Sequence, residues 1–265
     1  MSYDAAEGAR WHELVGALCG SAPDWPAGLA RACPEGGPDG IRLVRSVAGR
    51  LAWLAYLDHA PVPRPAKASD WAGRVSAWCF GERLRYSTAF SHLSGQSETW
   101  ANRFPDDSLL TALVGMAGCG LGREWGHDLV RRALAGADAD DRVSFVCLHA
   151  LWLALRRDES VASWLLGLSD DMLAKGVDSD VLHYRRARAY RVLGQVEDAF
   201  TEVSTAMAML DAGVDALPVS RDFLGEWGQI LAGMAPGDRS AALDRRVRAT
   251  PARPRRSVWS RARPA

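Results

Sequence analysis

The chain has 265 residues, of which 48% are hydrophobic and 24% are charged, and its acidic and basic side chains are equal in number. This composition is typical of a folded globular protein and excludes collagen-like and intrinsically disordered chains. The longest apolar runs, such as residues 51–57, are far shorter than the ~20 residues of a membrane span, and residues 1–10 lack the basic start and apolar core of a secretory signal. We therefore expect a cytoplasmic protein that does not enter a membrane.

Apolar residues recur at helical spacing along the chain, and no segment alternates long enough to predict a strand. Two apolar stripes fall within residues 1–60, the first containing Trp11 and Leu18 and the second Val44 and Leu51. Residues 21–40 between them are rich in proline and glycine, which predicts a loop. Three prolines within residues 61–65 predict that 61–70 is an extended linker following an N-terminal helical segment, residues 1–60.

Paired helices are predicted from residue 71 to residue 236. In chain order, their apolar faces are formed by Trp71, Val75 and Trp78, then by Tyr86, Ala89, Phe90 and Leu93, and then by residues within 109–118, 124–134, 143–155, 161–168, 181–210 and 223–231. Residues 104–108, Phe-Pro-Asp-Asp-Ser, combine a helix stop with a new N-cap. The N-cap of the last helix is predicted at Ser220.

The clearest pattern is the helix–turn–helix of residues 181–210, with its turn at Gly194 and Gln195. Ala187 on the first helix and Ala199 on the second are small enough to let the helices approach closely. Corresponding small and aliphatic residues recur at offsets of 36 and 37 residues, as in the series Val114, Ala150 and Ala187. These features resemble a divergent tetratricopeptide repeat, which implies an all-α fold in which helix pairs stack into a superhelical solenoid.

The resemblance covers about half the chain, is strongest over residues 181–210, and departs from the family in two places. His183 stands where the family usually has tryptophan, and Asp211 to Gly213 replace the proline that usually closes a unit. A helical bundle of unrelated ancestry with one accidental match is the alternative interpretation.

In this family the first helix of each unit lines a concave groove that binds partners. The resemblance therefore implies a groove lined by residues of two successive first helices, namely Val181, Tyr184, Arg188 and Arg191 in one and Ser144, Cys147, Leu151 and Ala154 in the other. Arg188 and Arg191, beside Tyr184, could clamp a carboxylate of a peptide or protein partner, because the guanidinium fork matches two oxygens. The competing interpretation is a solvated helix face.

The eleven tryptophans are divided by their neighbours. Those within apolar stripes are predicted to be core wedges, namely Trp53, Trp78, Trp125, Trp152 and Trp164. Trp100 and Trp227 have more polar neighbours and are predicted to be exposed.

The sequence contains no complete catalytic or metal-binding motif. Glu124 and His127 have the Glu-x-x-His spacing of di-iron bundles, but no second copy occurs. The glycine run of residues 115–122 follows a predicted helix and is not closed by Gly-Lys-Ser/Thr, so we interpret it as a helix end and not as a phosphate-binding loop. The five cysteines are odd in number and include no Cys-x-x-Cys pair, which predicts buried free thiols. We therefore expect neither a metal nor another cofactor.

The C-terminal segment, residues 237–265, is basic and predicted to be disordered. From Arg239 onward there are nine arginines and one acid, which leaves 23 basic and 31 acidic residues before it, a net charge of −8. Residues suited to phosphate contacts or base stacking are Arg253, Arg255, Arg256, Trp259 and Arg261. An arginine-rich extension without a function is the alternative.

These observations favour a non-catalytic adaptor, chaperone or assembly factor that holds a peptide or partner protein in a helical groove. One alternative is a regulator that contacts nucleic acid through its arginine-rich tail. The other is an all-helical, metal-dependent enzyme built around Glu124 and His127.

Overall fold

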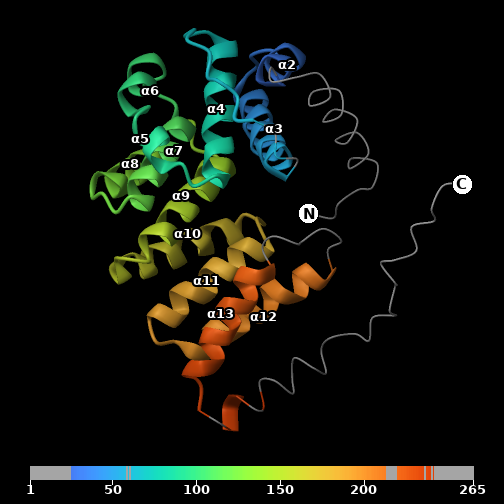
Figure 1. Ribbon diagram of the computed structural model, residues 1–265, viewed down its shortest axis with the longest axis vertical. Coiled ribbons are helices and arrows are strands. Elements are labelled where there is room, and N and C mark those ends of the chain that lie inside the picture. The colour runs from blue at the N-terminus through green and yellow to red at the C-terminus, as the bar shows by residue number, and fades with distance from the viewer. Residues whose placement is uncertain are drawn as a thin grey trace, which may run out of the picture. The chain divides into compact units, whose positions relative to one another are not determined.

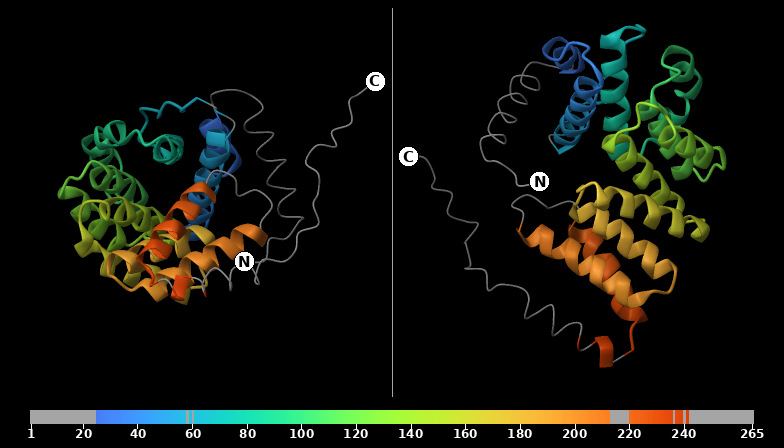
Figure 2. Two further views of the ribbon diagram at one scale, coloured as in Figure 1. Left: turned by 60° about the horizontal axis from the view of Figure 1, so that its bottom comes forward. Right: turned by 180° about the vertical axis from the view of Figure 1, so that it is seen from behind.

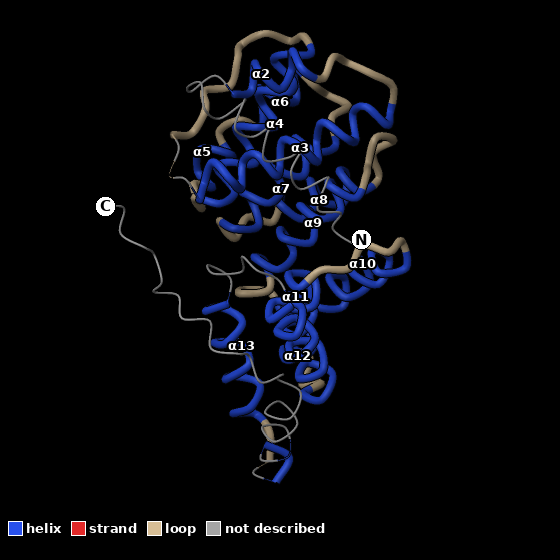
Figure 3. The backbone as a smooth tube through the Cα atoms, turned by 90° about the vertical axis from the view of Figure 1, so that its right-hand side faces the viewer, coloured by secondary structure: helices blue, strands red, loops and turns tan. Residues whose placement is uncertain are grey.

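The computed structural model describes residues 25–57, 59, 61–212, 220–235, 237–239 and 241. Its helices are α2 (Trp25–Ala32), α3 (Pro38–Leu57), α4 (Trp71–Tyr86), α5 (Phe90–Ser94), α6 (Ser97–Arg103), α7 (Ser108–Gly120), α8 (Trp125–Leu134), α9 (Asp141–Ala154), the 3-10 helix η1 (Glu159–Val161), α10 (Ala162–Ala174), α11 (Asp180–Val192), α12 (Val196–Ala212) and α13 (Ser220–Gly233). These residues contain no strand (Figure 3), so the prediction of an all-α chain is confirmed.

The chain divides into two compact units at Asp178 and Ser179. Helices α2 to α10 belong to the first unit and α11 to α13 to the second (Figure 1). The predicted domain limits at residues 60, 70 and 236 stay predictions.

In the N-terminal part of the first unit, the sequence predicted one helix correctly and missed another. The stripe containing Val44 and Leu51 is buried on α3, as predicted. The predicted loop of residues 21–40 is wrong in part, because α2 lies within it and α3 begins at Pro38. Pro26 and Pro38 stand in the first turns of these helices, where a missing amide hydrogen breaks no helical bond. The stripe containing Trp11 and Leu18 lies outside the described residues.

Helix α4 is longer than predicted, and two short helices follow it. Asp70 caps α4 by accepting a hydrogen bond from the amide of Gly73 at 2.9 Å. The chain leaves α4 through Thr88, whose φ of 54° is incompatible with continued right-handed helix. Helix α5 follows, and α6, which no pattern predicted, places Trp100 in the interior.

Glycines bring α7 and α8 into close contact. A Cβ atom on Gly126 of α8 would lie 2.5 Å from the amide nitrogen of Cys119, and one on Gly118 of α7 would lie 2.8 Å from the Cα of Gly126. Any larger residue at these positions would force the helices apart. The glycine run is thus a helix-packing surface that extends to the end of α7 at Gly120, in agreement with its interpretation as a helix end. Helix α9 then packs along α7 and α8, and α10 packs on α9.

A buried ion cluster joins α3 to the N-terminal ends of α7 and α9. The fully buried Arg45 donates hydrogen bonds to the carbonyl of Asp138 at 2.7 Å, to the Asp140 carboxylate at 3.3 Å and to the Asp107 carboxylate at 3.3 Å. It also pairs with the Asp138 carboxylate, and its guanidinium carbon lies 5.2 Å from the ring centroid of Trp78. Burial alone would lower the pKa of Arg45, but the three aspartates raise it above its usual value.

Asp107 is the acceptor at the centre of this cluster. Its buried carboxylate caps α7 through the amide of Leu110 at 3.0 Å and accepts from Trp78 Nε1 at 3.0 Å and Arg74 Nε at 2.6 Å. One side chain thus fixes the start of α7 and holds it against α3 and α4. The predicted N-cap within residues 104–108 is confirmed.

A second buried cluster lies farther along α4. Glu82 accepts a hydrogen bond from Arg142 Nε of α9 at 2.5 Å and pairs with Arg85 at 3.1 Å. Burial alone would raise the pKa of Glu82, but Arg142 and Arg85 lower it below its usual value. A Cβ atom on Gly49 of α3 would lie 2.4 Å from the Arg142 guanidinium, so that guanidinium occupies the space that Gly49 leaves open.

The second unit contains the helix pair that the sequence predicted most clearly. Gly194, with a φ of 75°, forms the turn between α11 and α12, which lie side by side (Figures 1 and 2). Ala187, Ala199 and Val203 are fully buried in a cluster that Ile230 of α13 completes, so the predicted contact between small residues is confirmed. Helix α13 begins at Ser220.

Candidate functional site

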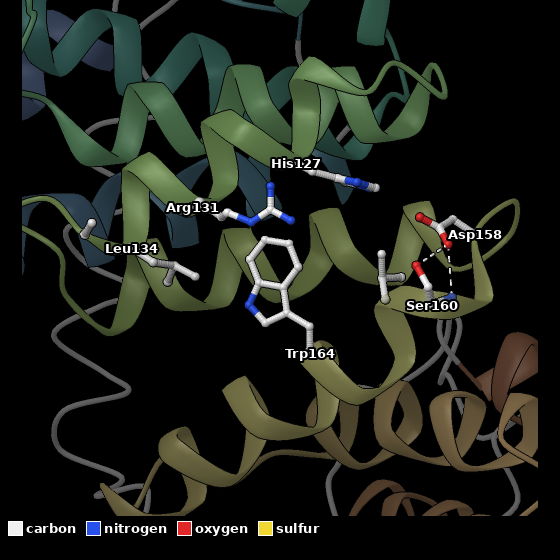
Figure 4. A pocket seen from close by; sticks show the side chains of 8 residues that line it. His127, Arg131, Leu134, Asp158, Ser160 and Trp164 are labelled. Atoms are coloured by element: carbon white, nitrogen blue, oxygen red, sulfur yellow. Dashed lines mark hydrogen bonds between the residues drawn. The ribbon is translucent and has the colours of Figure 1, made fainter.

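An open depression of about 660 Å³ lies between α8 and α10 (Figure 4). Its lining residues are His127, Arg131, Leu134, Ala135, Asp158, Ser160, Val161 and Trp164. Two neighbouring cavities continue it. One of about 600 Å³ shares Leu134 and Trp164 with it, and one of about 240 Å³ shares His127 and Asp158. We call the surface that lines the two larger cavities the Trp164 groove.

Trp164 stands in the middle of this groove. Its half-buried indole projects from α10 toward α8, where the guanidinium carbon of Arg131 lies 5.1 Å from the ring centroid (Figure 4). His127 meets the same ring edge-on, at a centroid distance of 6.4 Å. Arg131 also pairs with Asp128 at 3.0 Å. The groove therefore has an aromatic centre held by two side chains of the opposite helix.

One end of the groove is polar and carries a fixed negative charge. Asp158 accepts hydrogen bonds from the hydroxyl of Ser160 at 2.5 Å and from its amide at 3.0 Å (Figure 4). These bonds lower the pKa of Asp158, and the nearby His127 lowers it further. Asp158 is therefore the N-cap of η1, and the Ser160 hydroxyl is held by its carboxylate.

The other end of the groove combines apolar surface with both signs of charge. Its apolar part comes from Leu134, Leu168 and Met172, and its charges include Asp171 on α10 and Lys175 directly after it. An apolar centre between mixed charges is suited to holding a peptide segment or a helix of a partner.

The predicted partner-binding residues of α11 are packed within the second unit to different extents. Tyr184 is buried, and Val181 and Arg188 are half-buried. Arg191 pairs with Glu226 of α13, so its guanidinium fork is already occupied by a carboxylate. Arg191 of the predicted clamp is therefore engaged within the second unit.

The predicted residues of α9 lie inside the first unit. Cys147 and Leu151 have no exposed surface, and the Cys147 thiol lies 3.9 Å from the carbonyl of Val130. Ser144 and Ala154 are also buried, although each contributes to the edge of a cavity. A partner cannot touch Cys147 or Leu151 in this conformation, which corrects their assignment to an open surface.

The structure also revises the division of the tryptophans. Trp78 is fully buried, as predicted, whereas Trp100 is 2% exposed and Trp125 is 39% exposed, opposite to expectation in both cases. Trp164, predicted to be a core wedge, is half-buried. The sequence signal that was missed is the helical spacing of Trp164, Gly167 and Asp171, which places all three on one face of α10, beside its buried face.

The remaining predicted sites are the Glu124 and His127 pair, the cysteines and the basic tail. Glu124 and His127 line the 240 Å³ cavity, and within the described ranges no group of three histidine, cysteine, aspartate or glutamate side chains has a metal-binding arrangement. Cys79, Cys119 and Cys147 are buried free thiols, as predicted, and burial raises the pKa of Cys119 to about 12. The predicted tail contacts Arg253, Arg255, Arg256, Trp259 and Arg261 lie outside the described residues.

Comparison of the chain with protein-family models, with curated protein sequences and with solved structures finds no significant match. No helix among the described residues is long and apolar enough to cross a membrane.

Proposed function

We propose that this protein is a non-catalytic interaction scaffold that binds a peptide segment or a helix of a partner protein in the Trp164 groove. The observation that carries the proposal is the half-buried indole of Trp164, which lies in an open depression beneath Arg131. Tryptophan and arginine dominate binding energy at protein interfaces, because they bury large, well-ordered surfaces.

The charges around the groove suggest the chemistry of the partner. Four aspartates and three basic residues line the groove, so neither sign strongly predominates: Asp140, Asp141, Asp158 and Asp171, and Arg42, Arg131 and Lys175. A partner with an apolar anchor and flanking residues of both signs matches this surface better than a strongly acidic or basic one.

We further propose that α7 with α8, α9 with α10, and α11 with α12 are tetratricopeptide-like units of a superhelical solenoid. The buried small residues Gly126, Ala162 and Ala199, which have corresponding places in the three second helices, support this assignment. The Trp164 groove is then formed by the second helices of two successive units. It differs from the concave surface of first helices that the family resemblance implies.

Selection from a random peptide library displayed on phage, with the full chain as bait, tests the proposed function. The affinity of selected peptides is then measured for the wild type and for Trp164→Ala. We expect Trp164→Ala to weaken binding by at least about tenfold, as at an interface hot spot. Leu121→Ala is the matched control, because Leu121 is 40% exposed but lies outside the groove, and its affinity should equal that of the wild type.

A double variant tests whether the selected peptides bind in this groove or on the surface of α11. Arg188→Glu combined with Arg191→Glu should leave the affinity of the selected peptides unchanged. If the double variant lost binding while Trp164→Ala bound fully, the binding site would lie on α11, and the proposal that peptides bind in the Trp164 groove would be wrong. Circular dichroism of each variant establishes that its helices are intact.

A further inference from the structure

One face of α10 bounds the Trp164 groove along its whole length. Trp164, Gly167 and Asp171 follow one another at helical spacing on this face. Because α10 has 13 residues, the groove is about 20 Å long at 1.5 Å per residue. The opposite wall is formed by α8 in one cavity and by the start of α9 in the other, through His127, Arg131, Leu134, Ala135, Asp140, Asp141 and Ser144.

The packing of the helices around the groove leaves room for a further helix. Both α8 and α10 pack on α9, but they have little backbone contact with each other. The open depression of about 660 Å³ lies between them, and Trp164 projects into it (Figure 4). Side chains on both sides of such a depression form ridges between which those of a third helix can interdigitate.

Gly167 leaves a gap in the α10 face one turn after Trp164. A Cβ atom there would meet no atom within 4 Å, although the residue lines the cavity of about 600 Å³. At Gly118 and Gly126, by contrast, the corresponding space is filled by the neighbouring helix. Glycine in the middle of a helix is less favourable than alanine, but it lets a second helix approach closely. Gly167 thus resembles a helix-contact glycine that has no opposing helix among the described residues.

The backbone of an occupant has its own requirements. Polar backbone groups that lose water on binding need hydrogen-bond partners. An extended segment obtains them by pairing with the edge of a sheet, but the part of the chain that the structure describes contains no strand. A helix satisfies its backbone groups internally and presents only side chains to the groove. Walls made of helices therefore favour a helical occupant.

The charge at one end of the groove adds a requirement for the partner. Hydrogen bonds from Ser160 help to keep the pKa of Asp158 low, so its carboxylate is ionised beside the start of α10. Arg131 on the opposite wall pairs with Asp128. A basic side chain of the occupant would place an opposite charge at Asp158.

We propose that the occupant of the Trp164 groove is an amphipathic α-helix of about four turns, supplied by a partner protein. Its apolar face packs on Trp164, it approaches α10 most closely at Gly167, and a basic residue near one of its ends faces Asp158. Because this helix would occupy the same groove, its identification rests on the proposed function. Gly167 then sets how closely the partner can pack.

Two phage-displayed libraries of peptides of about 15 residues test the shape of the occupant, with the full chain as bait. One library carries variable apolar residues at helical spacing in an alanine-rich background, and the other carries the same residues with a central proline that prevents a continuous helix. We expect binders only from the helical library. Their affinity should fall at least about tenfold in Trp164→Ala.

The outcomes separate this inference from the proposed function. Binders from the proline library whose affinity depends on Trp164 would overturn the helical occupant and leave the groove as the binding site. Helical binders that do not depend on Trp164 would overturn the proposed function and this inference with it, as would the absence of binders from both libraries.

Gly167→Leu tests the position of the helix, because the new side chain has room in the free protein but fills the space that the partner would use. We expect the helical binders to lose at least about tenfold in affinity. Gly228→Leu is the matched control. Gly228 is an exposed glycine of α13 whose Cβ atom would also meet no atom within 4 Å, and this variant should bind like the wild type. Unchanged affinity in Gly167→Leu would overturn the placement of the helix along α10.

Asp158→Asn tests the charge, because asparagine can still cap η1 but carries no charge. Helical binders with a basic residue near one end should bind this variant about threefold more weakly than the wild type. Equal affinities would overturn the pairing of that residue with Asp158. Circular dichroism of each variant establishes that its helices are intact.

Discussion

Arg45 and Asp107 illustrate how a pair of charged residues is accommodated in an interior that is otherwise mainly apolar. Both side chains are fully buried, and each makes contacts with several elements. A buried ion pair contributes little net stability compared with an apolar pair of equal volume. Removing one partner is costly, however, because the other charge then stays buried without compensation.

The first prediction follows from this asymmetry. Arg45→Met should lower the free energy of unfolding by about 3 kcal/mol, because Asp107 and Asp138 lose a buried cation. The control is Arg42→Met, which lies one turn earlier on α3 and pairs with Asp39 at the surface. It should change the free energy by less than about 0.5 kcal/mol. Urea denaturation measures both, and equal effects would contradict the role given to the cluster.

The second prediction concerns pH and Glu82. Because Arg142 and Arg85 hold the pKa of Glu82 below the ~4.3 of an unfolded chain, its ionised form stabilises the fold at neutral pH. That contribution is present above the unfolded pKa and is lost as the pH falls through the lower folded value. The free energy of unfolding should therefore fall less steeply below about pH 4.3 in Glu82→Gln than in the wild type.

Urea denaturation at a series of pH values from neutral to acidic measures this slope. Glu98→Gln, which changes an exposed carboxylate on α6, is the control and should keep the slope of the wild type. If Glu82→Gln and the wild type lost stability in parallel, the ionised Glu82 would not be a source of folding free energy.

At the scale of helices, the close approach of α7 and α8 depends on residues that lack a side chain. Gly126→Ala would place a methyl group 2.5 Å from the backbone of Cys119, and neither helix can yield without separating from the other. We expect a loss of about 2 kcal/mol in the free energy of unfolding, as for an overpacked interior.

The matched control is Gly167→Ala, in the middle of α10, where a new Cβ atom would meet no atom within 4 Å. This change should raise the free energy of unfolding by about 0.5–1 kcal/mol, because alanine favours the helix. Thermal or chemical denaturation compares the two variants. A loss of stability in both would contradict the attribution of the Gly126 effect to close helix packing, because a Cβ atom on Gly167 meets no neighbour.

Helix positions were predictable to different degrees for physical reasons. The stripes of α3 and the pair α11–α12 follow the helical period closely, so periodicity located them. Helices α2 and α6 have 8 and 7 residues, too few for a period to be evident. Pro26 also gave α2 the composition of a loop, although proline in a first turn is compatible with a helix.

The Trp164 groove was harder to predict because it depends on which helices lie next to one another. The spacing of Trp164 and Arg131 within their helices is visible in the sequence, but the distance between α8 and α10 is not. Burial of Cys147 and Leu151 likewise follows from packing on other helices. A family resemblance placed the groove on first helices, and no sequence signal on α8 contradicted it.

At the scale of the whole molecule, the uneven distribution of charge leads to a further prediction. The residues after Thr250 include five arginines and no acid. If they contact phosphates, a chain ending at Thr250 should lose affinity for single-stranded DNA, and the full chain should bind it less tightly as salt concentration rises.

Fluorescence anisotropy at several salt concentrations measures this effect. Trp259→Leu in the full chain is the control that separates stacking from charge, because it keeps every arginine and should preserve the salt dependence while weakening binding. Equal DNA affinity in the full and shortened chains would exclude the tail as the contact.

Gly49 has a consequence for how this sequence can change over generations. Its missing side chain accommodates the Arg142 guanidinium, which Glu82 in turn holds in place. The three positions are therefore epistatic: a larger residue at position 49 would displace the Arg142 guanidinium and so weaken its contact with Glu82. Change at Gly49 is therefore linked to change at Arg142 and Glu82, because loss of either charge leaves the other buried without compensation.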